Sequence, residues 1–325
     1  MESLHVRYRT HYFHCNFSCE YCIAGHSSQV KAPDWDAARY RKVIANLAHL
    51  PYRLKVRIAV AGEIFLNHEL VDGARELSRA ANLEALNLIT NLSLPLAQYQ
   101  RIFEGFRIER TAVVASFHPS QVRDYDSWLR TAKVLAGQMD FCVVLVAYPP
   151  FLGDLSAHVS WLKQNGIETF VQPFIGVWNG QVYPRSYNAE ERRLVRSVMY
   201  SAHDVGYLLD LKKPGLCNAG HTAIYVHDSG VVYPCGSGTY AEPIGDLSRG
   251  PELRLSRQPQ LCPFATCQCD TDTFNTVEFQ TSYRLTGINQ HKYVPAVNAN
   301  HPATPEDRVL YTPGGNVMNE LFRVL

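Results

Sequence analysis

From its start to about residue 180, the chain alternates between two patterns of hydrophobic positions. Short runs rich in β-branched and aromatic residues predict six strands, at residues 4–13, 54–60, 85–90, 111–117, 141–148 and 169–174. Between them, apolar residues recur at helical spacing and predict helices at residues 35–47, 70–81, 96–103, 120–136 and 155–164. Asp34 is the expected N-cap of the first helix, because its carboxylate accepts hydrogen bonds from the unpaired amides of an opening turn.

Apolar, uncharged strands that alternate with helices indicate a parallel sheet covered by helices. Six such units predict an α/β fold, a partial (β/α)6 barrel of the TIM type, over residues 1–210. In barrels of this type the reactive groups lie at the carboxyl ends of the strands. The segments that directly follow the predicted strands are therefore where we expect the chemistry.

The rest of the chain has a different character. Another amphipathic helix is predicted from Asn188 to about His203. Residues 211–270 are rich in β-forming residues, turns and cysteine, and predict a small second domain that contains a β-hairpin. Residues 271–325 are rich in Asn, Pro and Thr and predict an irregular C-terminal extension.

Composition and charge narrow the function classes. The 325 residues are 46% hydrophobic and 19% charged, enough to bury a core. Lys+Arg 31 and Asp+Glu 30 give a net charge of +1, so the chain lacks the basic balance of a nucleic-acid binder. The longest apolar run, residues 141–153, is shorter than the ~20 residues of a membrane helix. The first residues do not resemble an export signal. We therefore expect a cytoplasmic protein without nucleic-acid or membrane partners.

The nine cysteines are odd in number, so they cannot all form disulfides within the chain, and they are clustered. Without an export signal, such clusters indicate metal ligands. Cys15, Cys19 and Cys22 directly follow the first predicted strand, and so short a loop can hold three corners of a [4Fe–4S] cluster, which normally has four cysteine ligands. One iron would then be open to another ligand. The alternative is a zinc site completed by His11 or His14, which the spacing disfavours but leaves open.

The spacing Cys15-x3-Cys19-x2-Cys22, with the aromatic Tyr21 before the last cysteine, resembles the signature loop of the radical S-adenosylmethionine (radical SAM) superfamily. The resemblance covers about residues 4–185 and implies that Tyr21 lies at the cofactor. It also implies a [4Fe–4S] cluster whose open iron chelates SAM. An electron from a reductant such as flavodoxin or ferredoxin would cleave SAM to a 5′-deoxyadenosyl radical, which abstracts hydrogen from the substrate. The barrel would hold the substrate close and exclude water.

Three later segments match the same family in order. Gly62 and Glu63, after the second strand, resemble the glycine–glutamate motif that binds the SAM amino group, although Ile64 stands where many members have proline. Asn91 completes a Thr-Asn pair at the end of the third strand, as the family often has. Ser116 ends the fourth strand, where a residue commonly contacts the SAM ribose or carboxylate. A further candidate for the SAM carboxylate, with a plain surface charge as the alternative, is Arg130.

A second group of cysteines lies in the predicted small domain. Cys217-x12-Gly230-x4-Cys235 resembles the opening of the SPASM and twitch domains that follow many radical SAM barrels, where a β-hairpin supplies two ligands of an auxiliary iron–sulfur cluster. The expected turn of that hairpin is Asp228-Ser-Gly230. Three more cysteines follow: Cys262, Cys267 and Cys269. The resemblance implies one auxiliary [4Fe–4S] cluster held by four of the five, and a structural zinc ribbon is the alternative.

Two residues are candidates for catalysis. Cys142, in the fifth predicted strand, is either a small core residue or a thiol that returns a hydrogen atom to a substrate radical, as an epimerase needs. His118, after the fourth strand, either orients substrate and moves a proton or begins a helix. Residues 172–174 and 179–187 are further candidates for substrate contact, with a strand end and an exposed loop as the alternatives.

The sequence supports three hypotheses about function. The favoured one is a radical SAM enzyme that dehydrogenates, epimerises or otherwise modifies a small polar metabolite of the sugar, nucleoside or aminocyclitol type. The second is epimerisation or crosslinking of a ribosomally made peptide. The chain leaves little room for the winged-helix module that many such enzymes carry, which disfavours it. The third is a non-enzymatic binding module stabilised by zinc, which would not cleave SAM.

Overall fold

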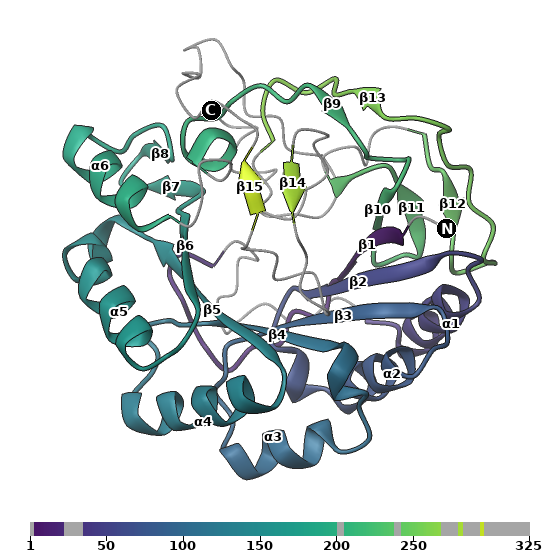
Figure 1. Ribbon diagram of the computed structural model, residues 1–325, viewed down its shortest axis with the longest axis horizontal. Coiled ribbons are helices and arrows are strands. Elements are labelled where there is room, and N and C mark those ends of the chain that lie inside the picture. Colours follow the sequence, from purple (N-terminus) through teal and green to yellow (C-terminus); the bar gives the residue numbers. More distant parts are fainter. Residues whose placement is uncertain are drawn as a thin grey trace.

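The computed structural model describes residues 3–22, 35–199, 205–236 and 242–267, and the backbone of two short paired strands, β14 (Phe279–Thr281) and β15 (Tyr293–Pro295). A curved sheet forms its centre, with helices on the outer face (Figure 1). Six strands are parallel and adjacent in chain order: β1 (Ser3–Thr10), β2 (Arg53–Val60), β3 (Leu83–Thr90), β4 (Thr111–Ser116), β5 (Asp140–Ala147) and β6 (Thr169–Pro173). The predicted partial α/β barrel is confirmed.

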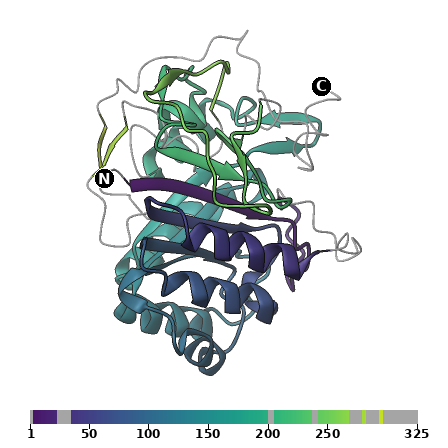
Figure 2. The same cartoon turned by 90° about the vertical axis from the view of Figure 1, so that its right-hand side faces the viewer.

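Helices lie in a layer against the sheet (Figure 2), and the first five of them connect these strands. The helices are α1 (Ala37–Ala48), α2 (His68–Ser78), α3 (Leu96–Phe103), α4 (Tyr125–Gln138), α5 (Leu152–Gln164) and α6 (Ala189–Val198). Short helical turns are η1 (Ile64–Leu66), η2 (Ile108–Arg110), η3 (Pro149–Phe151) and the π-helical η4 (Val205–Leu209). In the described ranges, none of the helices has the length and apolar character needed to span a bilayer.

Several helix boundaries differ from the prediction; α4, for example, begins at Tyr125 rather than at residue 120. The N-cap of α1 is Asp36, whose side chain accepts from the backbone N–H of Arg39; Asp34 lies outside the described residues. Because the cap lies two residues later, the helix also begins later. Helix α6 begins as predicted, with Asn188 and Glu191 in a reciprocal capping box, but it ends at Val198 rather than near His203.

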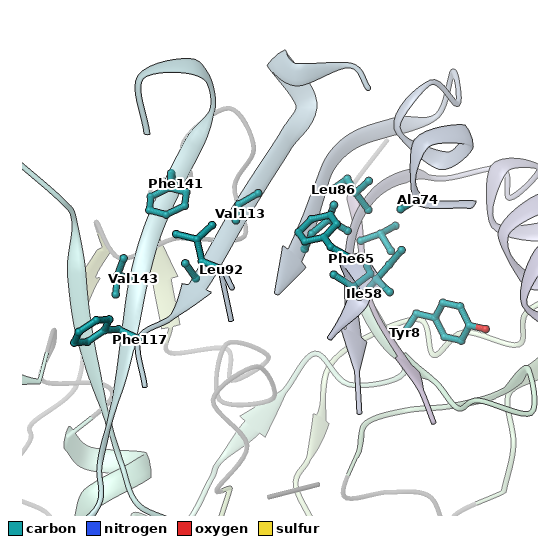
Figure 3. Packing of buried hydrophobic residues seen from close by; sticks show 14 of the residues in the cluster. Tyr8, Ile58, Phe65, Ala74, Leu86, Leu92, Val113, Phe117, Phe141 and Val143 are labelled. Carbon is teal, nitrogen blue, oxygen red and sulfur yellow. The ribbon is translucent and has the colours of Figure 1, made fainter. Parts of the chain in front are cut away.

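The main core lies between the sheet and the helices. Alternate strand residues point to this side, as the two-residue period of a strand requires. Tyr8 of β1 stacks on Tyr40 of α1 with ring centroids 5.8 Å apart, and the hydroxyl of Tyr40 donates to the carbonyl of Leu70. Farther along the sheet, Val113 and Phe141 belong to the same core (Figure 3). This packing holds the strands in register, so that their carboxyl ends meet at one edge.

The predicted β-hairpin is present. It consists of β10 (Ala223–Val226) and β11 (Val231–Tyr233), and β12 (Gly245–Asp246) pairs with it. Strand β10 pairs in parallel with β1, so the hairpin extends the barrel's own sheet to nine strands. In the turn, Gly230 has φ of +89° and a Cβ there would lie 2.7 Å from the backbone nitrogen of Ser248, so glycine is required.

A second hairpin was not predicted. Strands β7 (Gly176–Trp178) and β8 (Gln181–Tyr183) flank Asn179 and Gly180, which have φ of 48° and 73°. Asn-Gly with two positive φ values is the preferred two-residue hairpin turn, so the signal was present in the sequence. The alternative of an exposed loop at residues 179–187 holds for Asn179, Gly180 and Arg185, which are exposed, but not for Tyr183 and Tyr187, which are buried.

Candidate functional site

The loop after β1 carries the first three cysteines. Cys19 is buried, and Cys15 and Cys22 are half-buried. Burial, followed by the neighbouring Cys22 and Cys15, raises the pKa of the Cys19 thiol to about 12, so the three sulfurs are close enough to influence one another. In the part of the chain that the structure describes, no three His, Cys, Asp or Glu side chains are gathered closely enough to hold a single metal ion. An iron–sulfur cluster takes its thiolates on separate irons, so the three thiols of this loop could supply three of the four ligands that a [4Fe–4S] cluster normally has.

Gly62 lets the end of β2 lie directly against this loop. The backbone N–H of Ala61 donates to Thr10 and that of Glu63 to His14, each at 2.9 Å. A Cβ on Gly62 would come 2.3 Å from the carbonyl oxygen of Tyr12 and 2.4 Å from that of His14. No side chain fits there, so glycine is required to keep the two segments together.

Glu63 is a buried carboxylate, 1% exposed. Its Oε1 accepts from the backbone N–H of Phe65 at 3.2 Å and from the hydroxyl of Thr90 at 2.8 Å, and its Oε2 from the backbone N–H of Asn91 at 2.6 Å. Burial outweighs these three bonds and raises the pKa of Glu63 to about 7. No cationic side chain among the described residues contributes to the shift. Within the described ranges no cationic side chain offsets the charge of this carboxylate, and a bound amino cation such as that of SAM fits it.

Asn91 joins Glu63 to the cysteine loop. Its side-chain nitrogen donates to Asn16 Oδ1 at 2.9 Å and to the sulfur of Cys15 at 3.6 Å. Ser116 ends β4 half-buried, opposite Val144 of β5. The structure therefore brings the ends of the first three strands into one connected site.

His118, in the loop after β4, contacts the cysteine loop. Its Nδ1 lies 2.9 Å from the hydroxyl of Tyr21, and its ring packs edge-on against Phe17. Burial lowers the pKa of His118 to about 4, so the imidazole is neutral near pH 7. The same loop supplies Gln121, whose Oε1 accepts from the backbone N–H of Ser18 at 3.0 Å. This loop therefore braces the cysteine loop at two points.

Two other predicted residues lie apart from this site. Arg130 is exposed on α4, whereas its neighbours Trp128 and Leu129 face the core. Cys142 is fully buried on the face of β5 opposite the helices, in a small apolar cluster with Val114, Val144 and Phe170.

Basic residues on the inner face of the sheet were missed. Arg7 of β1 lies beside Arg57 of β2, which lies beside Asn87 of β3. The Nε of Arg57 donates to Asn87 Oδ1 at 2.7 Å, and the guanidinium of Arg7 lies 5.6 Å from the ring centre of Tyr225. The expectation that all strands are uncharged is wrong for β1 and β2. The signal was the charge at alternate positions, which marks one face of a strand.

The second group of cysteines is partly assembled. Strand β9 (Leu216–Cys217) pairs with β13 (Gln260–Leu261), and the backbone N–H of Cys262 donates to the carbonyl of Gly215 at 2.9 Å. Pro234, next to Cys235, packs at Gly220, three residues after Cys217. The segments that carry Cys217, Cys235 and Cys262 are thus neighbours. Cys267 is half-buried, and Cys269 lies outside the described residues.

No protein-family model and no curated protein matches the chain. Among solved structures, it is similar to native anSMEcpe with bound AdoMet, with a TM-score of 0.54 and 13% identity over 84% of this chain and 81% of that one. A polyhistidine-tagged form with bound AdoMet has a TM-score of 0.53 and 14% identity, over 76% of this chain and 75% of that one. The native form with bound AdoMet and the Cp18Cys peptide has a TM-score of 0.52 and 14% identity, over 76% of this chain and 78% of that one. This likeness shows the fold, which is that of the radical SAM enzymes, as the sequence predicted.

Proposed function

We propose that this chain is a radical SAM enzyme. Cys15, Cys19 and Cys22 would hold a [4Fe–4S] cluster, and Glu63 would bind the amino group of SAM. The cluster and SAM together supply a 5′-deoxyadenosyl radical that abstracts hydrogen from a substrate C–H bond. The observation that carries the proposal is the buried Glu63 carboxylate, whose charge no cationic side chain in the described part of the chain offsets. It lies beside a loop of three thiols, on a fold shared with AdoMet-bound proteins.

The protein's own groups would position the reactants. The hydrogen bonds from Thr90 and Asn91 fix the Glu63 carboxylate, so it is oriented before a ligand arrives. Tyr21, 7% exposed, packs against Tyr148 with ring centroids 4.9 Å apart, and this contact would hold its part of the cysteine loop in place. Ser116, at the end of β4, would contact the ribose or carboxylate of SAM.

As substrate we propose a small polar metabolite, such as a sugar, nucleoside or aminocyclitol. The polar row of Arg7, Arg57 and Asn87 across the inner face of the sheet supports this, because such side chains bind hydroxyl, carbonyl or anionic groups.

Four of the five later cysteines would hold one auxiliary [4Fe–4S] cluster, which in a dehydrogenase accepts the second electron. Electrons would come from flavodoxin or ferredoxin in a cytoplasmic setting.

A second candidate is modification of a peptide. It is favoured by one observation, that the fold matches an anSMEcpe structure with bound AdoMet and the Cp18Cys peptide. An assay of SAM consumption and solvent deuterium incorporation, run with sugars and with short peptides, separates the two substrate classes.

The central test is anaerobic reconstitution with iron and sulfide, reduction with dithionite, and a substrate-free assay for 5′-deoxyadenosine. We expect wild type to form 5′-deoxyadenosine and Cys15→Ala to form none, because one corner of the cluster is lost. Reactions without dithionite or without SAM are the controls. If wild type binds zinc instead of iron and sulfide, or leaves SAM intact, the proposal is wrong.

A further inference from the structure

Among the residues that the structure describes, the side chain of Asn91 is a polar group that reaches a sulfur of the cysteine loop from the end of another strand. Its Nδ2 lies 3.6 Å from the sulfur of Cys15, although the two residues are 76 positions apart in the sequence. The residue is 6% exposed. This contact therefore depends on the fold and is partly buried. A hydrogen bond to sulfur has more effect there than on the open surface.

The orientation of the amide is fixed by its neighbours. The backbone N–H of Ser93 donates to Asn91 Oδ1 at 3.1 Å, and a backbone N–H can only donate. The oxygen must therefore face Ser93, and the NH₂ group must face Cys15 and Asn16. The indole N–H of Trp128 donates to the backbone carbonyl of Asn91 at 3.3 Å and holds the backbone at this position. The Ser93 contact therefore fixes the geometry in which a side-chain N–H of Asn91 points to the sulfur.

The same residue holds Glu63 with its backbone. The Asn91 backbone N–H donates to Glu63 Oε2 at 2.6 Å, while its side chain donates to Cys15. Cys15 also accepts from the backbone N–H of Phe17 at 3.4 Å. One residue thus links the carboxylate proposed for SAM to a thiol proposed for the cluster, and it does so through two separable groups.

We propose that Asn91 is a positioning residue that sets the reduction potential of the cluster through its hydrogen bond to Cys15. This inference rests on the proposed function. When the cluster takes one electron from a flavodoxin, a ferredoxin or dithionite, negative charge on its sulfurs increases and no bond to Cys15 breaks. An N–H aimed at the sulfur stabilises that charge, so it favours the reduced form and raises the potential.

The test is a redox titration of the reconstituted holoenzyme, followed by electron paramagnetic resonance, with the signal assigned by its loss in Cys15→Ala. Asn91→Leu removes the donor, and Asn91→Asp keeps the shape but replaces the NH₂ by an oxygen. Both keep the backbone N–H that binds Glu63. We expect a more negative midpoint at unchanged iron content, of the order of a ten-fold change in the one-electron equilibrium, which corresponds to about 59 mV.

The matched control is Asn46→Ala, which removes a half-buried amide that donates to the Leu247 carbonyl at 2.8 Å, away from the cysteine loop. Its midpoint should equal that of wild type. A wild-type midpoint in both Asn91 variants overturns the inference, and so does loss of iron in both, since that shows a purely structural role. A wild-type protein that holds no cluster or leaves SAM intact overturns the proposed function instead, and the inference with it.

Discussion

The hydroxyl of Tyr21 and Nδ1 of His118 lie 2.9 Å apart, and this contact joins the cysteine loop to the end of β4. Tyr21 stands one position before Cys22, so a hydrogen bond at its tip limits how that part of the loop can move. The ring of Tyr21 also packs against Tyr148 and Phe151. Separate chain segments thus meet at the aromatic residue of the signature loop.

Tyr21→Phe should lower the free energy of unfolding by about 1 kcal/mol, the usual contribution of one hydrogen bond between neutral groups. The phenyl ring keeps its contacts with Tyr148 and Phe151, so packing changes little. Urea unfolding of the apoprotein measures the change. In a His118→Phe background the same substitution should cost less, because its partner is gone. An equal cost in both backgrounds would show that the pair does not interact.

Acidification should destabilise the protein through His118. Burial lowers the pKa of this residue from 6.5 to about 4, so between these values the unfolded chain binds a proton that the folded chain does not. Stability therefore falls as pH drops from about 6.5 to about 4, with a slope of up to about 1.4 kcal/mol per pH unit for one histidine.

His118→Asn is the variant that isolates this effect, because an amide keeps a polar partner for Tyr21 and does not titrate. Burial also lowers the pKa of His5 and of His11 to about 4, so the wild-type slope is a sum. When the free energy of unfolding is measured at several pH values, its slope against pH should be shallower for the variant than for wild type. An unchanged slope would mean that His118 is protonated equally in the folded and unfolded chain.

Gly62→Ala should be strongly destabilising, by more than about 2 kcal/mol, because the new Cβ would overlap the carbonyl oxygens of Tyr12 and His14. Both are backbone atoms, so the cysteine loop itself has to move, and we expect cluster loading to fall. Thermal unfolding and iron content measure the two effects. The control is Gly137→Ala in α4, where a Cβ meets nothing within 4 Å, and which should be neutral or slightly stabilising. Equal behaviour of the two variants would contradict the steric argument.

Much of the fold follows from local patterns. The six parallel strands and their helices were predicted because each is long enough to show its hydrophobic period. The hairpin of β7 and β8 was missed because its strands have three residues each, too few for a period, and only the Asn179-Gly180 turn marked it. The pairing of β10 with β1 joins segments about 220 residues apart and leaves no local pattern.

In the candidate site, too, some features follow from local sequence and others depend on contacts between distant segments. The cysteine loop and Gly62 could be identified from the sequence because the resemblance to the radical SAM superfamily rests on residues at short, fixed spacings. The contacts of Tyr21 with His118 and of Asn91 with Cys15 span 97 and 76 positions. Such pairs depend on which strands become neighbours, so they emerge only from the folded chain.

Asp228, in the turn between β10 and β11, should hold the hairpin to the barrel. Its Oδ1 accepts from the backbone N–H of His11 at 2.8 Å, and its Oδ2 from Nη2 of Arg39 at 2.7 Å. Asp228→Ala should lower the free energy of unfolding by about 1.5–3 kcal/mol, as expected for charged hydrogen bonds. A double-mutant cycle with Arg39→Ala in urea measures the coupling. Additive losses would show that the two side chains act independently.

The second cysteine group should hold its own cluster, separable from the first. Cys217→Ala should lower the iron and sulfide of the reconstituted protein by about half, because one [4Fe–4S] cluster of two is lost, while substrate-free formation of 5′-deoxyadenosine persists at the first cluster. Cys15→Ala should also lower the iron content by about half, and it should abolish formation of 5′-deoxyadenosine. The control for loss of a cysteine as such is Cys142→Ala, a fully buried residue outside both groups, whose iron content should equal that of wild type. Unchanged iron in Cys217→Ala, or one zinc per chain in its place, would contradict the auxiliary cluster.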